Sequence, residues 1–162
     1  GFIQDLPAEL VTSFKSTLEE SKNVDLLVHV IDASDPNHEE HEKTVLQIMK
    51  DLSMLDIPRL TLYNKADKIE DFTPTQTPYR LVSAKDPDSR TKLQDILLEK
   101  MQELFQPFTI QVPFEQAYRI HDLETMAILT ERSYEETGEV LTGYIAPKNA
   151  WRLEEFYHHG LS

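Results

Sequence analysis

The first 104 residues alternate between helical apolar stripes and short runs of apolar residues. Helices are predicted where apolar residues recur every three or four positions, and strands where apolar residues follow one another directly. The helices are expected at residues 6–20, 38–54 and 88–104, and the strands at residues 25–32, 57–63 and 79–83. The run at 25–32 is almost entirely apolar, which indicates a strand buried on both faces. Strands alternating with amphipathic helices predict an α/β fold whose parallel sheet binds ligands at the carboxyl ends of its strands.

The pattern changes at Gln106-Pro107. Alternating apolar residues at 108–114 predict a half-exposed strand, and helical spacing predicts a helix at 116–131. A hairpin is expected around Thr137-Gly138, followed by a short helix that begins at Pro147. We therefore expect a first domain at residues 1–106 and a small α+β domain, with the order β-α-β-β-α, at residues 107–162. Four aromatic residues of the second domain are expected to pack in its core: Tyr144, Trp151, Phe156 and Tyr157.

Composition excludes several classes of function. The 162 residues carry 29 Asp and Glu against 16 Lys and Arg, a net charge of -13, so the chain alone is not expected to bind nucleic acid. The absence of Cys excludes disulfides, thiolate zinc sites and a cysteine nucleophile. No apolar run approaches the roughly 18 residues of a membrane span. None of the four glycines precedes a Lys-Ser or Lys-Thr pair, so the sequence has no phosphate loop of the G-x-x-x-x-G-K-[ST] kind.

The strongest candidate chemistry is the tetrapeptide Asn64-Lys65-Ala66-Asp67, which follows the predicted strand at 57–63. Guanine presents two adjacent donors, N1–H and the exocyclic amine, and the carboxylate of Asp67 can accept both as a fork. Adenine offers no such pair, so it would leave the carboxylate without partners. Asn64 can bond the purine or hold the neighbouring loop, and the methylene stem of Lys65 can cover one face of the base. The competing interpretation is a charged turn that binds nothing.

A second candidate segment, Ser83-Ala84-Lys85, follows the next predicted strand. Because the carboxyl ends of parallel strands meet at one edge of the sheet, the backbone N–H of Ala84 is in a position to meet guanine O6. Lys85 can then cover the second face of the base. The dipeptide Ser-Ala is common in proteins, so this assignment depends on its position beside the first tetrapeptide.

Other polar clusters have simpler interpretations. His38-Glu39-Glu40-His41 resembles a metal cluster, but its histidines are three apart rather than four, which favours an exposed, acidic helix start. His29 lies in an apolar run and is expected to be a satisfied core histidine. Asp32 and Asp35 are explained by Asp-Pro turn chemistry. No Ser-His-Asp arrangement is apparent in the spacing, and we assign neither catalytic residues nor metal ligands.

Taken in order, these motifs resemble the carboxyl half of the HflX family of ribosome-associated GTPases. The matching segments are Gly1-Phe2-Ile3, Leu6-Pro7-Ala8-Glu9-Leu10-Val11, Val30-Ile31-Asp32-Ala33-Ser34-Asp35-Pro36, Asn64-Lys65-Ala66-Asp67 and Ser83-Ala84. The resemblance covers essentially the whole chain. It implies the last three strands of a P-loop NTPase sheet with their flanking helices, followed by a small C-terminal α+β domain.

The resemblance also implies a function for the intact protein. Such a protein would bind GTP or GDP with Mg²⁺, hydrolyse GTP, act on the large ribosomal subunit or on stalled ribosomes, and be cytoplasmic. Gly1 would donate its N–H to the γ-phosphate, and Phe2 stands where many GTPases carry the glutamine that orients water. The chain begins without Met and lacks the phosphate loop, so we expect a truncated piece. This piece is expected to retain base recognition and not to hydrolyse GTP. No cofactor is assigned to the piece by itself. Binding of adenine nucleotides is left open.

Two further expectations concern partners. A function from another class is a non-catalytic protein-interaction module that reuses the same fold. The strand at 25–32 would also have an unpaired, apolar edge in the isolated chain, which predicts a homodimer formed through this sheet edge.

Overall fold

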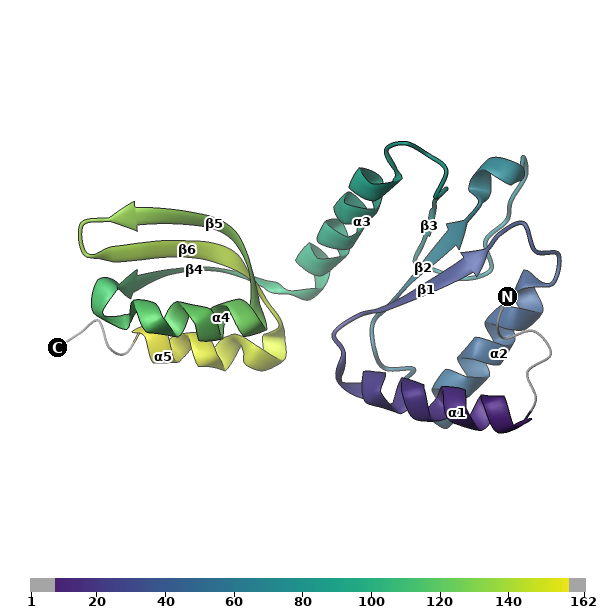
Figure 1. Cartoon of the computed structure of the whole chain (residues 1–162), viewed down its shortest axis with the longest axis horizontal. Coiled ribbons are helices and arrows are strands. Elements are labelled where there is room, and N and C mark those ends of the chain that lie inside the picture. The colour runs from purple at the N-terminus through teal and green to yellow at the C-terminus, as the bar shows by residue number, and fades with distance from the viewer. Residues whose placement is uncertain (1–7, 158–162) are drawn as a thin grey trace. The chain divides into compact units, whose positions relative to one another are not determined.

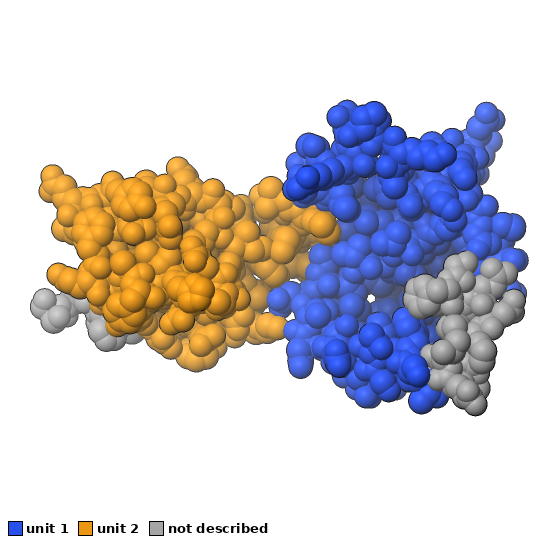
Figure 2. Space-filling view, viewed as in Figure 1, with its two compact units in different colours: residues 1–96 blue, residues 97–162 orange. Residues whose placement is uncertain are grey.

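The computed structural model describes residues 8–157, and side chains are described from residue 12 to residue 156. The chain forms two compact units, Gly1–Ile96 and Leu97–Ser162, which divide within helix α3 (Figure 2). The boundary expected from the sequence, Gln106, lies just after the end of this helix, and the domain limits stay a prediction. Within the described range, no helix has both the length and the apolar character needed to cross a membrane.

The first unit is built on a three-stranded parallel sheet with the order β1-β2-β3 (Figure 1). Its elements are α1 (Ala8–Glu19), the 3₁₀ helix η1 (Glu20–Asn23), β1 (Leu27–Asp32), α2 (His38–Asp51), β2 (Arg59–Asn64), the 3₁₀ helix η2 (Ala66–Lys68), β3 (Tyr79–Leu81) and α3 (Ser89–Leu104). The α/β alternation and the parallel pairing predicted from the sequence are therefore confirmed.

Helices α1 and α2 form an apolar layer with the start of β1. The stripe of α2 contributes Ile48 and Met49, which are buried against Phe14 and Leu18 of α1. Leu52 follows α2, and Ser53 then adopts a left-handed conformation with φ 56° that turns the chain away from the helix axis. These contacts explain why the apolar spacing at 38–54 predicts this helix correctly, although the helix ends at Asp51.

Strand β1 differs from its prediction. Val28 and Val30 are 40% and 60% exposed, so among the residues that the structure describes β1 is buried on one face only. The prediction of burial on both faces is wrong for β1. The central strand β2 is the buried one, since its residues 60–63 are at most 3% exposed. Leu27 packs against the same buried cluster as Phe14 and Leu18 of α1, whereas Val28 and Val30 are exposed.

A buried polar network fastens the loop after η2 to the sheet and to the start of α2. Glu42 is 1% exposed and hydrogen-bonds to His38 Nδ1 (2.9 Å) and to the hydroxyl of Thr75. The backbone N–H groups of Thr75 and Gln76 donate to the phenol oxygen of Tyr63, which is fully buried in β2. The exposed helix start expected at residues 38–41 is present at Glu39 and Glu40, but His38 is largely buried.

We predict that Glu42→Ala lowers the free energy of unfolding by about 2–3 kcal/mol, because it leaves Thr75 and His38 without their shared acceptor inside the unit. Glu39→Ala is the matched control, since Glu39 is exposed in the same helix, and its effect should stay within about 0.5 kcal/mol. Urea denaturation followed by circular dichroism measures both. Equal losses for the two variants would contradict a stabilising role for the network.

The second unit is a three-stranded antiparallel sheet with the order β4-β6-β5, packed against short helices. Its elements are β4 (Gln106–Pro113), the 3₁₀ helix η3 (Phe114–Arg119), α4 (Ile120–Met126), β5 (Ala127–Glu135), β6 (Gly138–Ile145), the 3₁₀ helix η4 (Pro147–Leu153) and α5 (Glu154–Tyr157). Alternate residues of β4 are buried, as its pattern predicts: Phe108, Ile110 and Val112. The β-α-β-β-α order is confirmed.

The helix expected at residues 116–131 is wrong in its second half. The helical segment ends at Met126, and residues 127–135 form β5, which pairs with β6 from Ala127↔Ile145 to Glu135↔Gly138. The apolar residues at 127–129 fit either period, and pairing with the next strand, β6, decides between them. The close packing of this pair is visible at Gly143, where a Cβ atom would lie 2.1 Å from the carbonyl oxygen of Ile128.

The aromatic core expected in this unit is only partly correct. Phe156 is 5% exposed and belongs to the core, where Arg119 lies over its ring at 4.4 Å. Trp151 is 61% exposed on η4, so the expectation that it packs inside is wrong. Tyr144 is half-buried, and the side chain of Tyr157 lies outside the described residues.

Candidate functional site

Parallel pairing brings the ends of β1, β2 and β3 to one edge of the first unit. Asp32, the last residue of β1, is in register with Asn64, the last residue of β2. The N–H of Ala33 donates to the carbonyl oxygen of Asn64 (2.9 Å), and the N–H of Val82 donates to that of Tyr63 (2.9 Å). The three loops that leave this edge therefore begin at fixed positions beside one another.

Asn64 joins the second loop to the third. Its Oδ1 accepts a hydrogen bond from the backbone N–H of Ala84 at 3.1 Å. Of the two roles expected for Asn64, the contact with the neighbouring loop is the one present. The same bond engages the N–H of Ala84, so any ligand acceptor that reaches this group must share it with Asn64 or displace it.

Lys65 makes the turn that separates β2 from η2. Its backbone is left-handed, with φ 62° and ψ 30°, a conformation that costs roughly 1–2 kcal/mol for a residue with a Cβ atom. Two backbone hydrogen bonds stabilise the turn. The N–H of Ala66 donates to the carbonyl oxygen of Val82 (3.2 Å), and the N–H of Lys68 donates to the carbonyl oxygen of Lys65 (3.0 Å). The position of the following carboxylate, Asp67, depends on this turn.

Asp67 and Ser83 form a second link between the loops. The hydroxyl of Ser83 donates to Asp67 Oδ1 at 2.6 Å, and this bond is the main cause that lowers the pKa of Asp67 below its ordinary value. The positive charge of Lys85 acts in the same direction. An ionised carboxylate has lone pairs for further donors besides Ser83, so it can accept a pair of N–H groups from a ligand.

The side chain of Lys65 is directed to the end of β1. Its Nζ donates to Asp32 Oδ2 at 2.5 Å, while Asp32 Oδ1 accepts both the N–H (3.0 Å) and the hydroxyl (2.6 Å) of Ser34. These contacts, Lys65 first and Ser34 next, lower the pKa of Asp32 to about 2. Sequence analysis explained Asp32 by turn chemistry alone and missed its contact with Lys65. The signal that could have found it is the place of Asp32 at the end of the strand beside Asn64.

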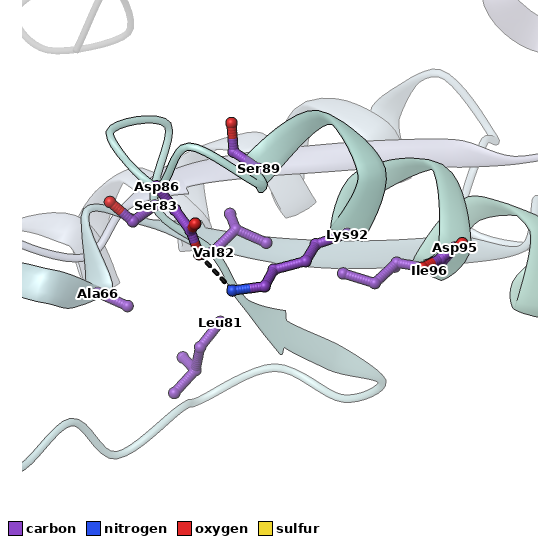
Figure 3. A pocket seen from close by; sticks show the side chains of 9 residues that line it. All are labelled: Ala66, Leu81, Val82, Ser83, Asp86, Ser89, Lys92, Asp95 and Ile96. Carbon is purple, nitrogen blue, oxygen red and sulfur yellow. Dashed lines mark hydrogen bonds and ion pairs between the residues drawn. The ribbon is translucent and has the colours of Figure 1, made fainter.

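A pocket of about 450 Å³ lies against the two loops on the side of α3 (Figure 3). Apolar side chains of Leu81, Val82 and Ile96 line it, and Lys92 reaches across it to the carboxylate of Asp86. Ala66 and Ser83 also line it, which makes the pocket continuous with the candidate loops. It offers an apolar wall beside polar loop groups.

The remaining candidates are taken in turn. Gly1 and Phe2 lie outside the described residues. His41 Nδ1 lies 3.4 Å from Asp35, and no group of three or more His, Asp or Glu side chains within the described chain is arranged to hold a metal ion. His29 is not the satisfied core histidine expected, because its Nδ1 is buried without a hydrogen-bond partner among the described residues. Burial is the main cause that lowers its pKa.

Comparison with curated proteins finds relatives along most of the chain. GTPase HflX of Alkalihalophilus pseudofirmus is 36% identical over 141 residues, which are 86% of this chain and 33% of the relative. GTPase HflX of Caldanaerobacter subterraneus is 31% identical over 156 residues, 96% of this chain and 36% of the relative. GTPase HflX of Escherichia coli is 30% identical over 159 residues, 94% of this chain and 37% of the relative. No protein-family model matches the chain.

This chain belongs to the HflX family. The resemblance stated from its motifs is thereby confirmed, since the HflX relatives match it across both units. The chain spans about a third of the length of the HflX proteins it matches.

The Asp32–Lys65 contact makes a testable prediction about acidity. In the unmodified chain, NMR titration should give Asp32 a pKa of about 2, and Lys65→Met should raise it toward the ordinary value of 3.8. Because folding lowers this pKa, the stabilisation from Asp32 is present above about pH 4 and is lost as the pH falls toward 2. The control is Asp67, whose pKa depends chiefly on Ser83 and should not change. An unchanged pKa of Asp32 in Lys65→Met would show that the ammonium of Lys65 does not bind this carboxylate.

Proposed function

We propose that the first unit is the base-recognition part of an HflX-type GTPase and that it binds guanine at the edge formed by the loops after β2 and β3. The observation that supports this proposal best is the pair of bonds that join the two loops, Ser83 to Asp67 and Ala84 to Asn64. Together they hold an ionised carboxylate and a polar amide side by side at the carboxyl end of a parallel sheet, where α/β folds bind ligands.

Recognition depends on the carboxylate of Asp67. Guanine N1–H and its exocyclic amine donate to this carboxylate as a fork, while Ser83 keeps the group oriented and its pKa low. Adenine has an acceptor at N1 and therefore faces the carboxylate with repulsion instead of a bond. Guanine O6 shares or takes the N–H of Ala84, and the side chains of Lys65 and Lys85 cover the two faces of the base.

The wider function is proposed for a longer HflX protein. There the sheet β1-β2-β3 would form part of a P-loop NTPase-type sheet, and Gly1 and Phe2 would belong to the segment that contacts the γ-phosphate. GTP or GDP with Mg²⁺, GTP hydrolysis, action on the large ribosomal subunit or on stalled ribosomes and a cytoplasmic location are proposed for that protein. The 162 residues contain no G-x-x-x-x-G-K-[ST] motif, so the chain by itself is proposed not to hydrolyse GTP.

Base recognition can be tested on the chain itself. Because only the base is contacted in this proposal, we expect roughly millimolar affinity for GMP and weaker binding of AMP. Titration followed by ¹H–¹⁵N correlation NMR should shift the amide signals of residues 64–67 and 83–85. Absence of GMP-dependent shifts in these loops would refute the proposed function.

Asp67→Asn provides the specificity test. The amide accepts N1–H but presents a donor to the exocyclic amine, so GMP binding should weaken at least about tenfold. XMP carries an acceptor at the same carbon and should bind the variant better than GMP. Asp71→Asn is the control, since Asp71 is exposed on the loop after η2, and it should leave the preference for GMP intact. Unchanged GMP affinity in Asp67→Asn would remove Asp67 from the site.

The alternative function, a non-catalytic interaction module, predicts a different result in the same titration. A module of this kind has no reason to distinguish GMP from AMP, so equal and weak shifts with both nucleotides would favour it. The homodimer expected through the edge of β1 stays a separate prediction; β1 is the first strand in the order β1-β2-β3. A monomer in light scattering at high concentration would refute it.

A further inference from the structure

We propose that Asp32 is a positioning residue for base recognition, which holds Lys65 so that its methylene stem is in place before a base arrives. This inference rests on the proposed function, because it assigns a role within the same site. It goes beyond the turn chemistry that explains Asp32 from the sequence.

The first support is the fixed position of Asp32. It is the last residue of β1, it is in register with Asn64, and the next N–H, that of Ala33, donates to the carbonyl oxygen of Asn64 at 2.9 Å. Lys65 follows Asn64 directly. Strand pairing therefore sets the distance between the Asp32 backbone and the Lys65 backbone, independently of either side chain.

The second support is the division of contacts within the carboxylate of Asp32. Oδ1 accepts two bonds from Ser34, at 3.0 Å and 2.6 Å, whereas Oδ2 accepts the ammonium of Lys65 at 2.5 Å. Because Ser34 occupies one oxygen, the carboxylate cannot rotate without breaking both of those bonds. The other oxygen is thereby fixed as an acceptor for Lys65.

The third support is the left-handed backbone of Lys65, with φ 62°. This conformation turns the chain into η2. As a result, Asp67 accepts a hydrogen bond from Ser83, while the side chain of Lys65 donates to Asp32 at the end of β1. The two functional groups of the tetrapeptide thus have separate anchors, Ser83 for the carboxylate and Asp32 for the lysine.

Magnitudes indicate that the pair serves binding more than folding. The side chains of Lys65 and Asp32 are 44% and 37% exposed, and ion pairs at such sites add little to the stability of a fold. Ordering a free lysine side chain costs rotamer entropy. When Asp32 has already ordered Lys65, a base that stacks on its stem does not incur that cost again.

The test is a double-mutant cycle on GMP binding with Asp32→Asn, Lys65→Met and the double variant. Lys65→Met retains an apolar stem but has no ammonium to be held. Each single variant should weaken GMP binding about three- to tenfold, and the double variant should bind no more weakly than Lys65→Met alone. Asp71→Asn is the matched control: it makes the same Asp-to-Asn exchange at an exposed position of the loop after η2, and it should change affinity less than about twofold.

The outcomes separate this inference from the function on which it rests. If Asp32→Asn lowers GMP affinity by the same factor in the unmodified chain and in Lys65→Met, Asp32 has a purely structural role and the inference is overturned. The proposed function would still stand in that case, because the unmodified chain binds GMP. If the NMR spectrum shows that Asp32→Asn is unfolded, Lys65→Met alone tests the inference. Unchanged GMP affinity of Lys65→Met would overturn it. A lack of GMP-dependent shifts in the unmodified chain would overturn the proposed function and the inference together.

Discussion

The parallel register of β1 and β2 is the constraint on which the candidate site depends. It aligns Asp32 with Asn64, and the short strand β3 then delivers Ser83 to the same edge. None of these side chains is held in a closed cavity, and their mutual bonds are partly exposed. Bonds of this kind contribute about 1 kcal/mol or less each. The sheet therefore fixes the backbone positions of the site residues, and the hydrogen bonds between their side chains only select among the rotamers available at those positions.

The polar contacts of this unit fall into a buried set and a more exposed set. The Glu42 network is buried and attaches a long loop to Tyr63 at the centre of the sheet. Buried polar groups are costly to leave unpaired, so this network favours one loop conformation strongly. The contacts of Asp32 and Asp67 are more exposed than this network. The bond from Ser83 uses one oxygen of Asp67, and the carboxylate has further lone pairs to accept other donors.

Local pattern predicted most elements, and its failures have identifiable causes. The helix at 38–54 and the central strand carry unambiguous spacing, and both are present. Residues 127–131 fit two periods, and only pairing with β6 makes them a strand. The candidate tetrapeptide was found because its residues are contiguous. Asp32 was missed as a partner of Lys65, because 33 residues separate them and only strand register brings them together.

The exposed face of β1 follows from the same distinction between pattern and context. An apolar run such as 25–32 records how much of the strand is buried in the complete assembly, not which residues cover it. Here α1 and α2 cover one face, and Val28 and Val30 remain exposed in a chain that spans a third of its relatives' length. Their apolar character is hard to explain by solvent exposure, since valine gains free energy from burial on either face of a sheet. The face of β1 with Val28 and Val30 therefore has the composition of a buried surface, whereas Asp32 at the end of the same strand is held by Ser34 and Lys65.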